Sequence, residues 1–131
     1  MKGYHDDIEQ QTTGNDDFRR VLYTGKNLQL VLMSLPPGCD IGAEVHEDRD
    51  QFFRVESGKG AVVIDDETTK IRAGDGIIVP AGAKHNVINT GKKRLKLYTI
   101  YGPPEHKDGI VEKTKEEAEE NEEHFDGTTT E

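Results

Sequence analysis

The chain has 131 residues, of which 32% are hydrophobic and 33% charged, a size that fits one ordinary domain. It contains no run of the about 18 to 20 uncharged apolar residues that span a bilayer, and its first residues lack the apolar centre of a secretory signal. We therefore expect a cytoplasmic protein. The single Cys39 excludes an internal disulfide and a zinc site built from several thiolates.

The negative charge is concentrated towards the end of the chain. The formal net charge is −9, and residues 105–131 hold 11 acidic and 3 basic side chains, whereas residues 1–104 hold 15 and 14. Binding to phosphate backbones or to anionic lipid requires clustered Lys and Arg, which this distribution does not provide. We expect neither nucleic acid nor a membrane as partner.

Short apolar runs separated by turn residues predict an all-β fold between Phe18 and Tyr101. Glycine and proline punctuate this region every ~8 to 12 residues, which is typical of a sandwich or an antiparallel barrel. We assign residues 1–17 to an N-terminal arm or a leading strand, 18–104 to the barrel and 105–131 to an acidic helical or flexible tail. The strands are expected near residues 18–24, 27–35, 42–46, 51–57, 59–65, 68–72, 75–79, 84–89 and 93–101.

The acidic tail has one clear helix signal. Thr114 and Glu117 have the spacing of a capping box, which predicts a helix of about three turns running to about His124, with Gly127 as the stop. His106 follows the last predicted strand and could cap the barrel mouth as an acid or base, although a histidine in such a loop is usually exposed. Within the barrel, we expect a mostly apolar interior that includes the following residues: Leu30, Leu32, Phe53, Val55, Val87, Asn89, Leu95, Leu97 and Tyr101.

Two segments resemble the two sequence motifs of the cupin superfamily. The stretch from Gly74 to Asn89 fits the second motif, G-x5-P-x-G-x2-H-x3-N, at every specified position. The first motif, G-x5-H-x-H-x3–4-E-x6-G, can be aligned with residues 38–58, with Glu44 in place of its first His and Gln51 in place of its Glu. The resemblance implies a single-domain cupin barrel, a jelly roll or double-stranded β-helix.

The same resemblance implies a metal site formed by Glu44, His46, Gln51 and His85. Residues two apart in a strand face the same side, so Glu44 and His46 should project together into the barrel. Gln51 should lie alongside them on the next strand, and His85 should reach the site from across the barrel. Gln51 has an alternative role, because a neutral amide can instead hydrogen-bond a bound water or substrate.

A site of two imidazoles, one carboxylate and one amide suits divalent Zn, Mn, Fe, Ni or Co. The four ligand types are similar to those of phosphomannose-isomerase-like cupins, which implies isomerase-type chemistry on a small oxygenated substrate, sugar-like or carbonyl. Metal-dependent dioxygenation and a non-catalytic module that binds a metabolite remain open alternatives. Small cupins commonly dimerise through edge strands, so the resemblance also implies a small-molecule ligand and a homodimer.

Overall fold

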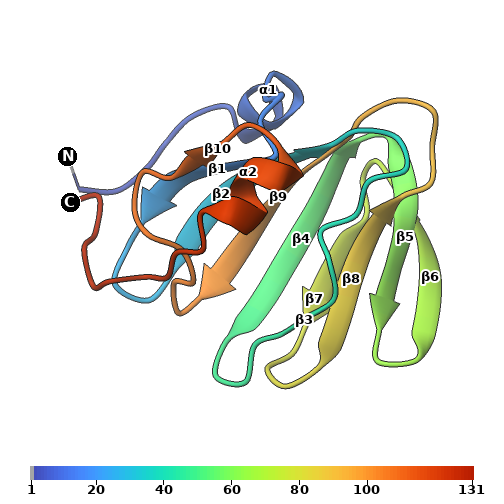
Figure 1. The fold of residues 1–131 in the computed structure, drawn as a ribbon. Helices are drawn as coiled ribbons and strands as arrows, with labels where there is room; N and C mark the ends of the chain where they lie inside the picture. The colour runs from blue at the N-terminus through green and yellow to red at the C-terminus, as the bar shows by residue number, and fades with distance from the viewer. Residues whose placement is uncertain (1) are drawn as a thin grey trace.

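The computed structural model describes residues 2–131 and contains two antiparallel sheets that enclose one core (Figure 1). One sheet has six strands in the order β10-β1-β2-β9-β4-β7, and the other has four in the order β3-β8-β5-β6. The expected all-β antiparallel barrel is confirmed. The strands are β1 (Arg19–Thr24), β2 (Gln29–Leu35), β3 (Glu44–Val45), β4 (Asp50–Ser57), β5 (Lys59–Ile64), β6 (Glu67–Arg72), β7 (Gly76–Val79), β8 (Lys84–Asn89), β9 (Leu95–Gly102) and β10 (Val111–Glu112).

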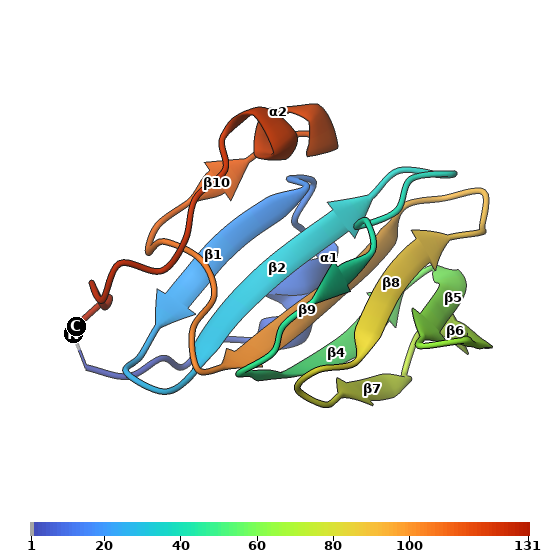
Figure 2. The same cartoon turned by 60° about the horizontal axis from the view of Figure 1, so that its bottom comes forward.

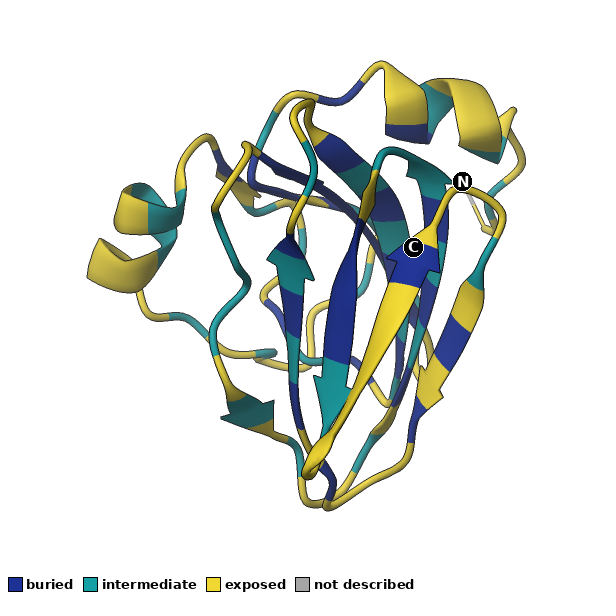
Figure 3. Ribbon diagram, turned by 90° about the vertical axis from the view of Figure 1, so that its right-hand side faces the viewer, coloured by how far each residue is buried: buried dark blue, intermediate teal, exposed yellow. Residues whose placement is uncertain are grey.

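Alternation of buried and exposed residues places the core between the two sheets (Figure 3). Every second residue of β9 is buried, from Leu95 to Tyr101, and β4 turns Phe53 and Val55 to the same interior. This is the period of two that a strand with one core face requires. The nine strands expected from the sequence all occur, with ends within two residues of the expected ones, whereas β10 was not expected.

The expected orientation of β2 was wrong. Val31, Met33 and Leu35 belong to the core, whereas Leu32 lies on the outer face of the sheet beside Gln10 and Gln11. The segment from residue 28 to residue 35 is apolar at nearly every position, so its pattern does not distinguish the two faces. The short helix that packs over this outer face also buries Leu32 to 1% exposure. The outer face therefore carries an apolar residue at this position, where a polar residue would usually mark the face turned to solvent.

That helix is α1 (Ile8–Thr13), in the segment for which the sequence left open an arm or a leading strand. The side chain of Asp7 caps its N-terminus by accepting a hydrogen bond from the Gln10 backbone N–H at 3.1 Å. No strand forms within residues 2–17. Neither helix in the described part of the chain is long and apolar enough to cross a membrane.

The acidic tail lies along the barrel and is attached at several points (Figure 2). Strand β10 pairs with β1, and further along the tail the Thr130 N–H donates to the Thr24 carbonyl at 2.9 Å. Helix α2 (Lys115–Glu120) begins as expected, because Thr114 accepts a hydrogen bond from the Glu117 N–H at 3.1 Å.

Helix α2 ends at Glu120, several residues before the expected end near His124. Its last turn has no basic residue and is followed by more acidic side chains, which is unfavourable near the negative end of the helix dipole. Glu123, beyond the helix, instead bonds the segment that follows β9. The chain therefore leaves the helix to make these contacts.

Candidate metal centre

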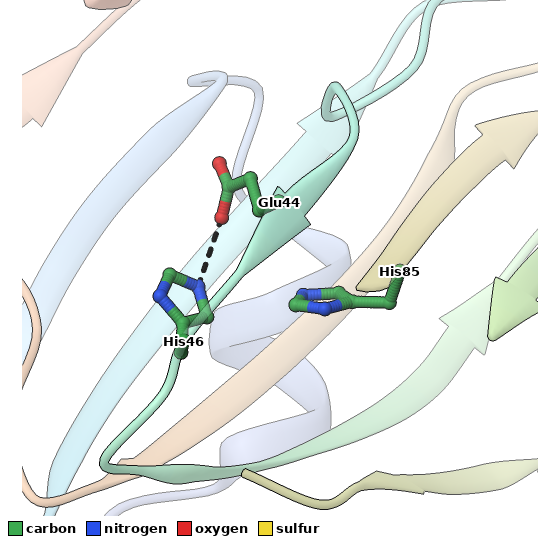
Figure 4. Close-up of side chains that lie close together, drawn as sticks. All are labelled: Glu44, His46 and His85. Carbon is green, nitrogen blue, oxygen red and sulfur yellow. Dashed lines mark hydrogen bonds and ion pairs between the residues drawn. The ribbon is translucent and has the colours of Figure 1, made fainter. Parts of the chain in front are cut away.

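Three of the expected ligands lie together at one mouth of the barrel (Figure 4). Glu44 stands on β3 and is the cross-strand partner of His85 on β8, while His46 follows β3 by one residue. One ligand atom from each of the three side chains lies within 4.8 Å of the others. These residues therefore form a compact group of one carboxylate and two imidazoles.

The strands that supply this group differ from the expected ones. His85 does not reach across the barrel, because β8 is hydrogen-bonded directly to β3. Gln51 is the residue on the opposite sheet, since β4 belongs to the six-stranded sheet. Strands β3 and β4 are neighbours in sequence, yet the loop between them passes from one sheet to the other, as in Greek-key connections.

The three side chains have distinct hydrogen-bond roles. Oε2 of Glu44 lies 3.0 Å from Nε2 of His46, and the rings of His46 and His85 are 5.4 Å apart between centroids. Nδ1 of His85 lies 3.2 Å from the carbonyl oxygen of Ala83, which can only accept, so Nδ1 carries the proton. This leaves Nε2 of His85 as the unprotonated nitrogen that a metal requires.

The protonation states of these residues agree with that geometry. Burial lowers the pKa of His85, which favours the neutral imidazole at neutral pH. The hydrogen bond with Glu44 raises the pKa of His46, despite the opposing effect of burial. Burial alone would raise the pKa of Glu44, but the hydrogen bond with His46 and the positive charges nearby lower it, so this carboxylate is ionised.

Gln51 has a buried side-chain amide whose oxygen lacks a hydrogen-bond partner within the described chain. The side chain is 3% exposed, and its Nε2 donates to Oγ1 of Thr99 at 2.9 Å. Its buried Oε1 accepts no hydrogen bond from any residue of the described chain. A buried carbonyl oxygen without a partner is costly, and a divalent ion supplies such a partner. The donor set and this bare oxygen both fit a divalent metal.

Aromatic residues and a cavity surround the group. The rings of Tyr101 and Phe53 lie 5.8 Å from His46 and 6.2 Å from His85 respectively, measured between ring centroids. A cavity of about 450 Å³ lies between the barrel and the tail and reaches Glu44 and His46. Residues of the tail, including Ala118 and Glu123, form its outer wall. Access to Glu44 and His46 therefore passes beside the tail.

The structure also brings to this mouth His106, which was considered from the sequence as a cap there, and Glu105, Glu123 and Arg49, which were not. His106, expected to be exposed, is 7% exposed, with Nε2 at 3.2 Å from the Tyr101 hydroxyl and Nδ1 at 2.7 Å from Glu123. Glu105 lies 3.4 Å from Nδ1 of His46 and 2.7 Å from Arg49. The sequence did not predict the contacts with Glu123, His46 and Arg49, because these join segments that are distant along the chain.

Comparison with known proteins identifies the family to which this arrangement belongs. The model of the family described as "Cupin domain" matches residues 31–101, which include all four expected metal ligands. The chain belongs to the cupin family. The resemblance of the two sequence motifs is thereby confirmed at the level of the family, and a possible metal site of Glu44, His46 and His85 accompanies it.

Several relatives of this cupin span much of its length. It is 46% identical to the uncharacterized protein YrkC of Bacillus subtilis over 85% of this chain and 63% of that protein. It is 41% identical to the uncharacterized protein L612 of Acanthamoeba polyphaga mimivirus over 80% of this chain and 68% of that protein. The chain thus spans about two thirds of the length of these relatives. A solved structure, BH2720 from Bacillus halodurans, superposes with a TM-score of 0.90 at 43% identity, covering 92% of this chain and 96% of that one.

Proposed function

We propose that this cupin is a metal-dependent enzyme that acts on a small oxygenated substrate, sugar-like or carbonyl, by isomerase-type proton transfer. The observation that carries the proposal is the grouping of Glu44, His46 and His85, whose ligand atoms lie within 4.8 Å of one another beside a cavity of about 450 Å³. A cavity of this size suits a small molecule.

Glu44, His46 and His85 would hold a divalent ion of Zn, Mn, Fe, Ni or Co, with Gln51 as the fourth ligand through its bare Oε1. When bound, such an ion supplies Lewis acidity that polarises a carbonyl or hydroxyl oxygen of the substrate. The fixed proton on Nδ1 of His85 and the hydrogen bond from Gln51 to Thr99 hold both ligands in one orientation.

Residues next to this group support proton transfer. The Tyr101 hydroxyl contacts Nε2 of His106, whose Nδ1 contacts the carboxylate of Glu123, so the three form one hydrogen-bonded chain. Glu123 is kept ionised, because hydrogen bonds from His106 and the Lys107 N–H outweigh its burial and lower its pKa. The ionised carboxylate favours a proton on Nδ1 of His106 and leaves Nε2 to accept or return one.

Exchange of substrate hydrogen with solvent tests this proposal. The metal-loaded protein is incubated in D₂O with glyceraldehyde and dihydroxyacetone, and deuterium at the carbon beside the carbonyl is followed by NMR. We expect incorporation above the rate of the His85→Ala variant and of free metal. Oxygen consumption with these compounds would instead favour the dioxygenase alternative. Saturable binding without exchange would favour the metabolite-binding module.

A further inference from the structure

One arginine inside the barrel mouth is not used by the proposed metal site. Arg19 on β1 lines the same cavity as Glu44 and His46, and its side chain is only 10% exposed. The guanidinium lies 5.4 Å from the centroid of the Phe18 ring. A buried arginine is costly unless its charge and its donors are matched, so its partners indicate its role.

The hydrogen bonds of Arg19 are incomplete. Nη1 donates to Oε1 of Glu112 at 2.8 Å, across the β1–β10 pairing. Nε is buried and donates to no residue within the described chain. A guanidinium carries five N–H donors in a planar fork, which suits two parallel bonds to a carboxylate. Arg19 therefore retains donors for a second acceptor, and Oε2 of its partner Glu112 is likewise without a hydrogen bond in the described chain.

The other charged groups deep in the cavity contact ionic or hydrogen-bonding partners of their own. Glu105 pairs with Arg49, Glu123 with His106 and Lys115 with Asp40. The acidic residues Glu119 and Glu122 lie at the exposed edge, where water screens them.

The charge at the metal follows from its own ligands, since Arg19 and Glu112 are opposite charges. Arg19 and Glu112 cancel, and Glu44 neutralises half of the charge of a divalent ion, while metal-bound histidines are neutral. The ion with its one carboxylate ligand therefore keeps a charge of about +1. A ligand with a single negative charge would neutralise it.

We propose that the cavity takes small monocarboxylates bearing a neighbouring hydroxyl or carbonyl oxygen, with Arg19 binding the carboxylate. This inference rests on the proposed metal function and names its substrate class. A carboxylate matches the free donors of Arg19 and the remaining charge of the ion, and the neighbouring oxygen is the second donor that a chelate requires. A neutral sugar would leave the guanidinium of Arg19 without its second acceptor.

Binding of glycolate and ethylene glycol tests the inference, because the two differ by a carboxylate in place of one alcohol group. Both are titrated calorimetrically into the metal-free and the Mn²⁺-loaded protein. We expect glycolate to bind the Mn²⁺-loaded protein at least about tenfold more tightly than ethylene glycol. Arg19→Met should reduce this preference by weakening glycolate binding, while leaving Mn²⁺ affinity within about twofold. Arg20→Met, an exposed position on the same strand, should change neither affinity.

Removing Arg19 alone leaves Glu112 buried without a partner, so Arg19→Met/Glu112→Gln is measured beside it. An unchanged glycolate affinity in either folded variant overturns the inference, and Mn²⁺ binding by the wild type would still support the metal function. Failure of the wild type to bind Mn²⁺ overturns the metal function. If Arg19-dependent glycolate binding persists in that case, the carboxylate site itself is supported.

Discussion

His85 on β8 is the direct cross-strand partner of Glu44 on β3, so a two-residue edge strand is enough to place a carboxylate against a buried imidazole. His46 completes the group from the position just after β3, where its Nε2 lies 3.0 Å from Glu44. The positions of three ligands thus depend on the pairing of β3 with β8. His85 is buried on the six-residue strand β8, and the pairing of the two-residue strand β3 with β8 places Glu44 and His46 beside it.

The role of Gln51 can be tested by introducing the carboxylate that the first cupin motif has at this position. In Gln51→Glu, we expect tighter binding of a hard divalent ion such as Mn²⁺, by about tenfold, because a carboxylate is the stronger ligand for such an ion. Without metal, the variant should be less stable than the wild type, since a carboxylate replaces an amide at a position that is 3% exposed. Calorimetric Mn²⁺ titration and thermal unfolding with and without metal measure both effects.

Gln10→Glu adds the same charge on the exposed face of α1 and serves as the control. Weaker Mn²⁺ binding by Gln51→Glu than by this control would show that Gln51 does not contact the metal.

Attachment of the tail should depend on Glu123. In Glu123→Ala, Nδ1 of His106 and the N–H of Lys107 lose their acceptor, and we expect the free energy of unfolding to fall by about 1–3 kcal/mol. Urea unfolding followed by circular dichroism measures this change. Glu122→Ala, at the exposed neighbouring position, should change the stability by less than about 0.5 kcal/mol. Equal losses in the two variants would argue against a specific role for Glu123.

The contact between α2 and the barrel should weaken in acid. The hydrogen bond from Lys115 lowers the pKa of Asp40 below its ordinary value. Because the folded pKa is the lower one, the stabilisation is fully present above the unfolded pKa of about 3.9 and is lost as pH falls through the folded value. Both side chains are partly exposed, so we expect only about 0.2–1 kcal/mol at neutral pH.

Carboxyl NMR titration measures the pKa of Asp40 in the wild type and in Lys115→Met, where it should move up towards its ordinary value. Lys113→Met, an exposed position in the same tail, should leave it unchanged. The stability difference between the wild type and Lys115→Met should shrink as the pH is lowered. A pKa that is the same in all three proteins would refute the contact.

The sequence was sufficient for nine of the ten strands, because alternation and turn residues are local signals, and its two motifs indicated the cupin family. The second motif predicted His85 as a metal ligand, and the two-residue spacing of Glu44 and His46 predicted that both face the same side of one strand. The structure brings these three side chains together. The orientation of β2 could not be predicted, since Leu30 and Val31 are equally apolar and only packing selects between them.

The arrangement around the site could not be predicted either. The sheet to which β4 belongs is decided by a long-range connection, so the pairing partners of the site strands were misassigned. His106 is buried by Glu123, which lies 17 residues further along, and Arg19 meets Glu112 across 93 residues of chain. No local pattern encodes such contacts, because their spacing follows no period of a helix or a strand.

Elemental analysis of the protein, purified without added metal or chelator, tests the central claim most directly. The wild type is compared with His85→Ala and with His124→Ala, whose side chain is 78% exposed. We expect near-stoichiometric Zn, Mn, Fe, Ni or Co in the wild type and in His124→Ala, and its loss from His85→Ala. Equal metal content in all three proteins, or a wild type that also fails to take up added ions, would contradict the account.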